Sequence, residues 1–388
     1  MKRLRILADD LTGALDTAAA FAGEVPVFID APPAGDHRYR DATVSVVATP
    51  TRDVAPQTLE KHLAPTLDWF CSGDLAYKKV DSLLRGNTFA EIAWLCAHGH
   101  FSGTVFAPAF PGQGRFTTNN RQWVEKPGTP RHAVAQPLRE AFAGVGMTAC
   151  SAPETPGTGQ SVWIPEVLDD ADLDRIAAQL DTPGMHKTLW CGSAGLAQAI
   201  ARRCQWAPNG QDAFQPAPPE GPTVLVSASF QPVLYAQWEA LKAARPTPAI
   251  AERARPEEIT AALDLAKSGA AQAWFDLSPR REMTQTESLA LLQSRIERLV
   301  EGLPKPGQLM IVGGDTLLGL CRATGAEALL AGASIRNGWG RATLIGGRWD
   351  GTACHSRSGA FGDPDDLIQM MMLLDRTANS EILREEMK

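Results

Sequence analysis

Short apolar runs alternate with helical segments along this chain, and that alternation limits the folds open to it. Leu4–Ala8 is too short and too continuously apolar for an amphipathic helix, so we expect a buried strand. From Leu11 the apolar residues recur at helical spacing, and Gly23 is a plausible stop. Further strands are expected at Val25–Ile29, Thr43–Ala48, Leu75–Lys79, Thr104–Ala107 and Thr188–Cys191, with helices over Pro56–Phe70, Phe89–Ala97, Asp170–Leu180 and Leu196–Arg203. This alternation predicts βαβ units and a mostly parallel sheet, hence an α/β fold.

A proline-rich stretch, residues 206–222, divides this pattern in two. Because proline neither joins a strand ladder nor continues a helix, the stretch is a predicted linker. Beyond it, strands are expected at Thr223–Ser227, Ala273–Leu277 and Leu309–Val312, with helices near Glu257–Ser268 and Thr284–Glu301. A chain of 388 residues is long enough for two domains, so we expect α/β domains at 1–205 and 223–388 with a ligand cleft between them. Residues 108–160 have no clear assignment.

The charge balance and cysteine pattern narrow the functional classes. Thirty-seven Lys and Arg against 44 acidic residues give a formal charge of −7 without a basic block, which argues against nucleic-acid binding. The first apolar run meets carboxylates after a few residues, unlike a secretory signal, and no run approaches the length of a membrane span. Seven scattered cysteines without a CxxC pair indicate reduced thiols. We therefore expect a soluble cytoplasmic protein with no membrane partner.

Two carboxylates stand where the first strand ends, in Ala8-Asp9-Asp10-Leu11-Thr12-Gly13-Ala14-Leu15-Asp16. Ligands of open parallel sheets bind beside the carboxyl ends of the strands. A carboxylate pair there can hold Mg²⁺, accept a proton or bind substrate hydroxyls. The simpler alternative is that Asp10 caps the helix and Asp9 is solvated. Capping explains one aspartate but not two beside a glycine, so the pattern favours a functional site.

A second polar segment, Lys78-Lys79-Val80-Asp81-Ser82-Leu83-Leu84-Arg85-Gly86-Asn87, also follows a predicted strand. Cations beside an aspartate and a serine suit a small anionic, hydroxylated ligand, and Arg85 can clamp a carboxylate or phosphate through two hydrogen bonds. Arg52, which follows the strand Thr43–Ala48, would add a cation on the same rim. The alternative is a surface turn with exposed ion pairs.

The third segment, Ile311-Val312-Gly313-Gly314-Asp315-Thr316, combines a strand end, two glycines and a helix start. Backbone N–H groups in such a turn can cradle phosphate, although Gly-Gly also occurs in ordinary turns. The small residues and the cation of His355-Ser356-Arg357-Ser358-Gly359-Ala360-Phe361-Gly362-Asp363 could close over a nucleotide. The P-loop, dinucleotide-binding and H-E-x-x-H motifs do not occur, and Cys96, His98 and His100 have no second pair of ligands for zinc.

Six segments, in order along the chain, resemble the four-carbon acid sugar kinase family, formerly a domain of unknown function. They are Ala8-Asp9-Asp10-Leu11-Thr12-Gly13-Ala14, Lys78–Asn87, Ala107-Pro108-Ala109-Phe110-Pro111, Gly192-Ser193-Ala194-Gly195-Leu196-Ala197, Gly313-Gly314-Asp315-Thr316, and Ser358-Gly359 with Phe361-Gly362 and Asp365. The family contains ATP-dependent kinases acting on threonate, erythronate and 3-oxo-tetronate. The resemblance therefore implies an N-terminal acid-sugar-binding domain and a C-terminal nucleotide-binding domain.

The resemblance also implies which residues bind each ligand. The positions that match the family's substrate contacts are Asp9, Arg52, Lys79, Val80, Asp81 and Ser82. The charge pattern of the segment itself adds Arg85. Positions matching its nucleotide contacts are Ser229, Gly313, Gly314, Asp315, Thr316 and Gly359.

Four features depart from the family pattern. Ala228-Ser229-Phe230-Gln231 stands where Gly-Ser-Cys-Ser is usual, which weakens the expectation of nucleotide contacts beyond Ser229. Arg357 replaces a lysine, and Leu83 removes a hydroxyl from the usual Asp-Ser-Thr-Leu-Arg. Residues 117–156 match poorly, so we expect substrate preference to be set there.

The resulting hypothesis is transfer of the γ-phosphoryl group of ATP, with Mg²⁺, to the terminal hydroxyl of a four-carbon sugar acid. Arg52, Lys79 and Arg85 would neutralise the substrate carboxylate or the phosphate. Asp9, Asp10 and Asp81 are the catalytic candidates, which would accept the hydroxyl proton or orient Mg²⁺. The rival class is a non-catalytic sensor of sugar acid or nucleotide, and a nucleotide-dependent oxidoreductase is disfavoured without a dinucleotide fingerprint. The stereochemistry of the acid and the oligomeric state, a homo-oligomer included, stay open.

Overall fold

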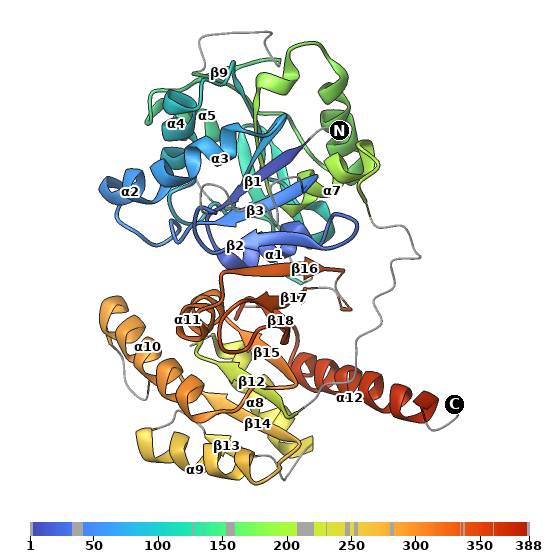
Figure 1. Cartoon of the computed structure of the whole chain (residues 1–388). Coiled ribbons are helices and arrows are strands. Elements are labelled where there is room, and N and C mark those ends of the chain that lie inside the picture. Colours follow the sequence, from blue (N-terminus) through green and yellow to red (C-terminus); the bar gives the residue numbers. More distant parts are fainter. Residues whose placement is uncertain are drawn as a thin grey trace. The chain divides into compact units, whose positions relative to one another are not determined.

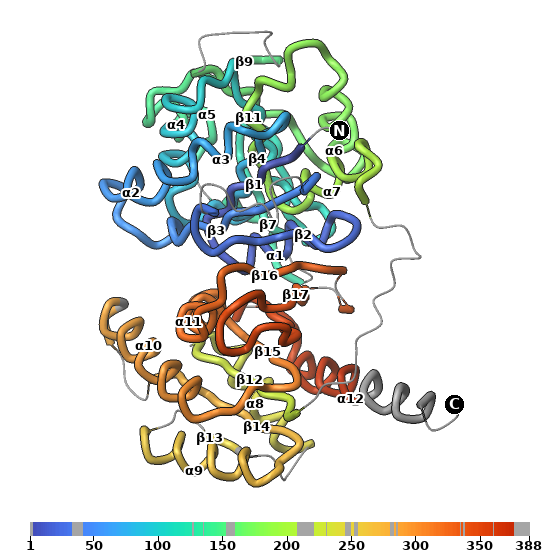
Figure 2. Tube along the Cα trace, in the orientation of Figure 1, coloured from blue at the N-terminus to red at the C-terminus, as the bar shows by residue number. Residues whose placement is uncertain are grey.

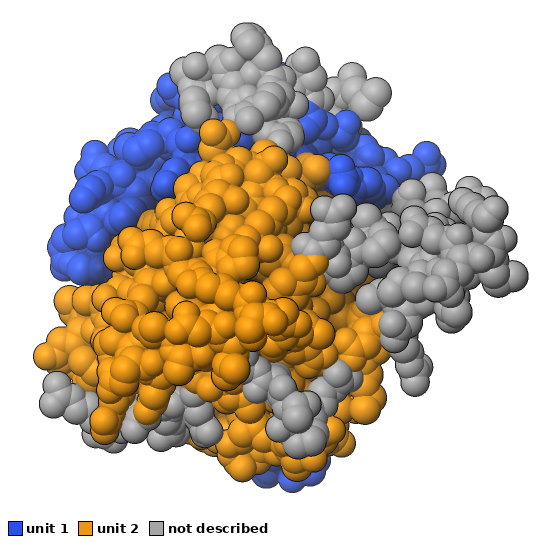
Figure 3. Space-filling model, turned by 60° about the horizontal axis from the view of Figure 1, so that its bottom comes forward, with its two compact units in different colours: residues 1–212 blue, residues 213–388 orange. Residues whose placement is uncertain are grey.

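A computed structural model confirms the α/β prediction and divides the chain into two units, residues 1–212 and 213–388 (Figure 3). The structure describes residues 3–32, 42–125, 128–134, 136–152, 160–207, 221–229, 231–244, 249–251, 255–279, 283–333, 335–336, 338–359 and 361–385. Most of the predicted linker, residues 208–220, lies outside them.

The main sheet of the first unit is parallel at every described pairing. In spatial order its strands are β2 (Val25–Phe28), β3 (Val44–Ala48), β1 (Leu4–Ala8), β4 (Leu75–Lys79), β11 (Leu189–Gly192), β5 (Thr104–Ala107), β10 (Ser161–Trp163) and β9 (Thr148–Cys150). The central strand β1 is buried throughout, because helices cover both faces and leave its side chains no contact with water. Apart from Arg5, its residues are apolar, which is the pattern expected of such a strand.

Helices of the first unit lie on opposite sides of this sheet. They are α1 (Leu11–Ala18), α2 (Leu59–Leu63), α3 (Leu67–Cys71), α4 (Thr88–His98), α5 (Leu138–Ala143), α6 (Asp170–Ala177) and α7 (Ala194–Arg203). Figure 1 shows α3 and α4 on one side and α7 on the other. The single helix predicted over Pro56–Phe70 is wrong, because Pro65 lies in a 3₁₀ turn, Ala64–Thr66, that separates α2 from α3.

The unassigned middle region builds a small antiparallel sheet of its own. Its strands are β6 (Arg115–Thr118), β7 (Arg121–Val124) and β8 (His132–Ala133). A bridge between Thr117 and Val167 ties it to the segment before α6. The alternation seen elsewhere fails here because these strands are short and only partly buried.

The second unit has a sheet that is parallel over most of its width. Its order is β13 (Ala249–Ala251), β14 (Gln272–Asp276), β12 (Thr223–Ser227), β15 (Gln308–Val312), β18 (Ala353–Arg357), β17 (Gly340–Ile345) and β16 (Ala328–Gly332), with β17 antiparallel to both of its neighbours. Figure 2 follows the trace of this unit through β12, β14 and β15.

Two groups of helices cover this second sheet. They are α8 (Pro232–Ala244) and α12 (Asp366–Glu385) on one side, and α9 (Pro256–Lys267), α10 (Gln285–Gly302) and α11 (Gly314–Thr324) on the other (Figure 1). Trp238 of α8, Met370 of α12 and Trp274 of β14 share one buried cluster. In the part of the chain that the structure describes, no helix is both long and apolar enough to cross a membrane.

Candidate active site

The carboxyl ends of five parallel strands of the first unit are level with one another. Ala8 is in register with Ala48 and with Lys79, Lys79 with Gly192, and Gly192 with Ala107. The segments that follow β3, β1 and β4 therefore emerge at one edge of the sheet. This edge, which we call the charged edge, carries Asp9, Asp10, Arg52 and Val80–Arg85.

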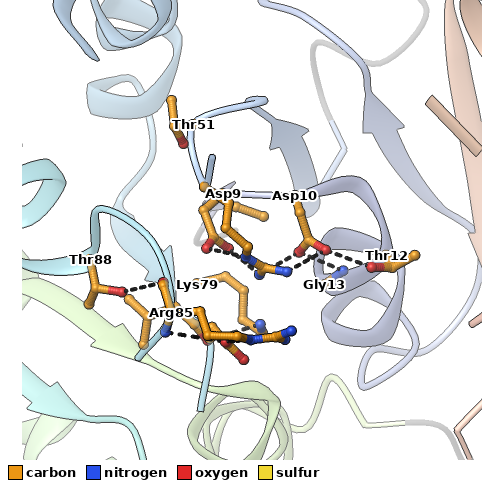
Figure 4. Close-up of polar contacts among 12 residues, drawn as sticks. Asp9, Asp10, Thr12, Gly13, Thr51, Lys79, Arg85 and Thr88 are labelled. Atoms are coloured by element: carbon orange, nitrogen blue, oxygen red, sulfur yellow. Dashed lines mark hydrogen bonds and ion pairs between the residues drawn. The ribbon is translucent and has the colours of Figure 1, made fainter. Parts of the chain in front are cut away.

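At the charged edge one guanidinium binds both aspartates of the first motif. Arg52 donates from Nε to Asp9 Oδ2 and from Nη2 to Asp9 Oδ1, both at 2.9 Å. The same side chain reaches Asp10 Oδ1 from Nη2 at 2.8 Å and pairs with Asp10 Oδ2 through Nη1 at 2.8 Å. Figure 4 shows Asp9 and Asp10 next to each other at this edge. The paired carboxylates thus hold a cation in the site.

Asp10 also caps the helix, as the simpler alternative predicted. Its Oδ1 accepts from the Gly13 N–H at 3.0 Å, and its Oδ2 accepts from the Thr12 hydroxyl at 2.6 Å. Capping and Arg52 binding therefore use the same carboxylate of Asp10, whereas both Asp9 oxygens accept from Arg52 and Asp9 is 3% exposed. The expected helix cap at Asp10 is confirmed, whereas the expectation that Asp9 is solvated is wrong, because Asp9 is buried.

Gly13 lets a second cation approach the start of α1. A Cβ on Gly13 would stand 2.4 Å from Asp10 Oδ1 and 3.0 Å from Lys79 Nζ. The Lys79 ammonium donates to the carbonyl of Val80 at 2.9 Å, and the residue is buried. A side chain at position 13 would push Lys79 and Asp10 away from the helix.

The loop after β4 carries a second ion pair. The Arg85 side chain pairs with Asp81 through Nε. The backbone N–H of Arg85 also donates to Asp81 Oδ2, at 3.3 Å. The Asp81 side chain is 9% exposed, whereas that of Arg85 is 54% exposed. Arg85 therefore keeps part of its guanidinium open to a ligand. Val80 and Ser82 are buried, and the backbone of Val80 is hydrogen-bonded to Lys79 and to Gly192.

Backbone contacts lock this loop against the loop that carries Arg52. The Asn87 amide donates to the carbonyls of Thr51 and Val54, both at 2.8 Å. Gly86 has φ +79°, and a Cβ there would stand 2.5 Å from the Arg52 carbonyl oxygen. The two cation-bearing loops are thus held as one piece.

The neighbouring cations hold the edge carboxylates in the charged form. Burial raises the pKa of Asp9, but Arg52, Lys78 and Lys79 outweigh it and bring that pKa below its usual value. Burial likewise raises the pKa of Asp81, yet Arg85, Arg52 and Lys79 lower it to about 2. Burial lowers the pKa of Arg52, but Asp10 and Asp9 outweigh it, so the net pKa is raised and the guanidinium stays protonated.

Lys78 belongs to the core rather than to the edge. Its ammonium pairs with Glu91 Oε2 at 2.7 Å, and both side chains are buried. Thr51 donates to the same oxygen at 3.0 Å and lies 2.9 Å from the Thr49 hydroxyl. This buried network supports the strand end from which Arg52 departs.

Sequence reasoning missed two polar residues of the small sheet. The buried Gln122 amide donates to the Ser82 carbonyl at 2.9 Å and so links β7 to the charged edge. Arg115, at the start of β6, interacts electrostatically with Asp81, Arg85 and Asp16. Neither follows a strand of the main sheet, so the strand-end rule could not find them. The sequence signal available for Arg115 was its position after Gly114, a residue typical of turns.

The nucleotide-binding candidates of the second unit also meet at one edge. Ser227 is in register with Val312 and with Asp276, and Val312 with Arg357, all in parallel strands. Ser229, Gly313–Thr316 and Gly359 follow three of these strand ends, and we call this the glycine edge. A Cβ on Gly359 would stand 2.3 Å from Ser229 Oγ, which places those two residues together.

The backbone conformation at position 313 favours glycine, which has no side chain. It precedes α11 with φ +114° and ψ 135°, a conformation that other residues rarely adopt. A Cβ there would stand 3.1 Å from Thr316 Oγ1. Thr316 is buried, whereas Asp315 is exposed in the first turn of the helix.

Arg357 binds the protein rather than facing a ligand. Its guanidinium donates to the carbonyls of Ser358 and Phe361 at 3.0 and 2.6 Å and pairs with Asp366 at 3.0 Å. It lies over the Trp339 ring, 5.0 Å from the centroid, and the residue is 2% exposed. The arginine thus fixes the loop that carries Gly359.

The remaining motifs are structural. Ser193 caps α7 and donates to the Ala109 carbonyl at 2.7 Å, and a Cβ on Gly192 would stand 2.7 Å from the Ala107 carbonyl oxygen. Cys96 contacts the Thr104 hydroxyl, and His98 bonds the Trp94 carbonyl within its own helix. Nowhere among the described residues do three His, Cys, Asp or Glu side chains gather as a metal site.

Comparisons with known proteins show what this chain is similar to. Residues 4–144 match the family described as a sugar-binding N-terminal domain. A D-threonate kinase of Bordetella bronchiseptica is 29% identical over 94% of this chain and 95% of its own length. A D-threonate kinase of Cupriavidus necator is 30% identical over 61% of this chain and 63% of its own length.

Two solved structures share the fold. A Salmonella typhimurium protein, provisionally named a tRNA synthase, has a TM-score of 0.69 and 19% identity, and the match covers 95% of this chain and 99% of the other. A Haemophilus influenzae protein of the DUF1537 family has a TM-score of 0.67 and 16% identity, covering 97% of this chain and 99% of the other.

The fold is α/β, and the N-terminal part of the chain matches a family of sugar-binding domains. Most of the chain is similar in sequence to D-threonate kinases. It is accordingly a kinase, a phosphotransferase with an alcohol group as acceptor.

Proposed function

We propose that this kinase transfers the γ-phosphoryl group of ATP to the terminal 4-hydroxyl of a four-carbon acid sugar. D-threonate is the first candidate substrate, since it is the substrate in the names of both relatives, with erythronate and 3-oxo-tetronate next. The observation that carries the proposal is the meeting of Asp9, Arg52, Lys79, Asp81 and Arg85 at one strand edge of the sugar-binding domain.

The charged edge would bind the acid. A sugar acid presents one carboxylate and several hydroxyls, so it needs cations beside hydrogen-bond acceptors. Arg85 is the half-exposed cation, suited to the substrate carboxylate or to the transferred phosphoryl group. Lys79 and Arg52 supply further positive charge, and Asp9, Asp81 and the Val80–Ser82 backbone supply acceptors for hydroxyls.

The glycine edge would bind the nucleotide. Phosphate oxygens are bound well by backbone N–H groups at a helix start, and α11 begins at Gly314 after the open turn of Gly313. Ser229 and Gly359 lie together on the same edge, where the missing side chain of Gly359 lets the Ser229 hydroxyl approach the backbone. Asp315 and Thr316 are the remaining residues of the proposed nucleotide-binding site.

Mg²⁺ fits the glycine edge better than the charged edge. Kinases hold Mg²⁺ through one or two carboxylates together with substrate phosphates, so no cluster of protein ligands is needed. Asp315 is exposed in the first turn of α11, beside the proposed phosphate site. Asp315 would then hold the ion, which neutralises phosphate charge when bound.

Charge placement would do most of the catalysis. The transition state of phosphoryl transfer spreads negative charge over the equatorial oxygens, so positioned cations stabilise it. The pairs Asp9–Arg52 and Asp81–Arg85 would hold two guanidinium groups in fixed positions before the substrate arrives. Asp9, Asp10 and Asp81 thus serve as carboxylates that position cations, with Asp81 also open to a substrate hydroxyl.

The direct test is ATP-dependent phosphorylation of a panel of acids. D- and L-threonate, D- and L-erythronate and the 3-oxo acids are each incubated with ATP and Mg²⁺, and ADP and the sugar phosphate are measured. We expect D-threonate 4-phosphate in amounts equal to ADP. Binding of acid and nucleotide without any ADP release would instead indicate the sensor, and phosphorylation of another acid alone would correct the substrate.

A further inference from the structure

Four carboxylates approach the charged edge, and they differ in which oxygens are still available. Both oxygens of Asp9 accept from Arg52. Both oxygens of Asp10 accept hydrogen bonds, Oδ1 from Gly13 and Arg52 and Oδ2 from Thr12. Asp81 is paired with Arg85, which keeps it charged and makes it a weak base. These three are better suited to holding cations than to accepting a proton.

Asp16 is the remaining carboxylate of the first motif, and the proposed function gives it no role. It lies on α1 and is exposed. Within the residues that the structure describes, no hydrogen bond or ion pair engages its oxygens. It is therefore both accessible and uncommitted.

The helix turns Asp16 toward the edge rather than away from it. Asp16 follows Gly13 by three residues, and residues so spaced share one helix face. Side chains on a helix lean toward its N-terminus, which here is the end at Asp10. Lys79 Nζ lies 3.0 Å from where a Cβ on Gly13 would stand, so this ammonium sits over the same face.

Charges from three elements act on Asp16. It interacts electrostatically with Lys79 at the end of β4, with Asp10 at the start of α1 and with Arg115 at the start of β6. Arg115 in turn interacts with Asp81, and its Nε is buried without a hydrogen-bond partner among the described residues. Asp16 and Arg115 thus belong to the same charged neighbourhood as Asp81 and Lys79.

We propose that Asp16 is the catalytic residue that accepts the proton of the attacking hydroxyl. This inference rests on the proposed kinase function. As the acceptor oxygen bonds to the γ-phosphorus, its O–H bond breaks and the proton passes to an Asp16 oxygen. The bond from the γ-phosphorus to the β,γ-bridging oxygen breaks, and its electron pair leaves with ADP. Because Asp16 is exposed, the proton then passes to water.

The test compares Asp16→Asn with Asp16→Glu, Asp81→Asn and the control Asp170→Asn, an exposed helical aspartate of the same unit. A positioned base contributes about 100- to 10,000-fold, so we expect Asp16→Asn to lower kcat at least 100-fold. Calorimetric affinity for the acid should stay within about threefold, and Asp16→Glu should recover part of kcat. The Asp170→Asn variant should match the wild type.

The outcomes separate this inference from the proposed function. An Asp16→Asn enzyme that keeps more than a tenth of kcat overturns Asp16 as the proton acceptor and leaves the kinase proposal intact. An equal loss of acid affinity and kcat also overturns it, because it makes Asp16 a binding residue. A wild-type protein that phosphorylates no acid of the panel overturns both. Circular dichroism of each variant checks that a lost rate does not come from a lost fold.

Discussion

The charged edge and the glycine edge lie at equivalent strand ends of two sheets, yet charged side chains form the first and glycines form much of the second. At the charged edge, side chains bind one another, with Arg52 across Asp9 and Asp10, and Arg85 on Asp81. At the glycine edge, the glycines lack side chains, and Arg357 is buried in protein contacts. Equivalent strand ends can therefore serve charge recognition in one unit and backbone recognition in the other.

This difference predicts that substitutions at the two edges impair the binding of different ligands. A substitution at the charged edge should act on the acid through lost charge, and one at the glycine edge should act on the nucleotide through lost space. The largest effect is expected where a buried charge is left without its partner.

Asp9→Ala should lower turnover by about 1000-fold or more. It removes both hydrogen bonds that orient Arg52 from Asp9, although Arg52 keeps Asp10. Breaking a buried pair costs about 3–5 kcal/mol, and the retained Asp10 contact reduces this to about 1–3 kcal/mol of unfolding free energy. Steady-state kinetics and urea unfolding measure the two effects.

The control for Asp9 is an aspartate in an exposed pair. Asp74 pairs with Arg3 at 3.8 Å, with side chains 50% and 41% exposed, so Asp74→Ala should leave turnover unchanged and cost at most about 1 kcal/mol. If Asp9→Ala turned over at the wild-type rate, neither Asp9 nor its hydrogen bonds to Arg52 would contribute to catalysis.

Gly313→Val should weaken nucleotide binding by about 10- to 100-fold and leave acid binding unchanged. Its φ of +114° strains a β-branched residue by about 1–3 kcal/mol, and the new side chain meets Thr316. Calorimetry with an ATP analogue and with D-threonate measures both affinities.

Gly269→Val is the matched control for backbone strain. Gly269 has φ +101° in the same unit, but nothing lies within 4 Å of an added Cβ. It should lose stability without losing nucleotide affinity. If both glycine variants weaken the nucleotide equally, general strain explains the effect and the glycine edge does not bind phosphate.

How far the sequence predicted this arrangement depends on the type of residue. Asp9, Asp10 and Asp81 were found because they follow buried strands, and Lys79 because it ends one, since parallel strands place their ends together. The sequence also located Gly313 from its position between β15 and α11. What it could not show was the pairing, since a spacing along the chain does not reveal that one arginine binds two aspartates.

Elements stabilised by tertiary contacts escaped prediction. The strands β16–β18 and the helices α8 and α12 were not expected, and Gln122 reaches Ser82 only because the small sheet folds back onto the edge. Arg357 looked like a ligand cation from sequence, yet Trp339 and Asp366, distant in sequence, enclose it. Local patterns predicted the strand ends, whereas long-range packing decided which charges stay available.

The smallest expected effect is a pH dependence confined to the charged edge. The pKa of Asp81 is about 2 in the folded protein, against an ordinary value of 3.8, so its ion pair stabilises the fold above about pH 4. That contribution is lost as the pH falls toward 2. The difference in urea unfolding free energy between wild type and Asp81→Asn should therefore shrink from pH 6 to pH 2.5. A difference that does not change with pH contradicts the charged Asp81–Arg85 pair.

Arg52 is the residue on which the contrast between the two edges depends most. Calorimetry of Arg52→Ala with D-threonate and with an ATP analogue compares the two ligands in one variant. We predict a loss of acid affinity of about 100-fold or more, with nucleotide affinity within twofold of the wild type. Retained acid binding, or an equal loss for both ligands, would contradict the assignment of the acid to the first unit and the nucleotide to the second.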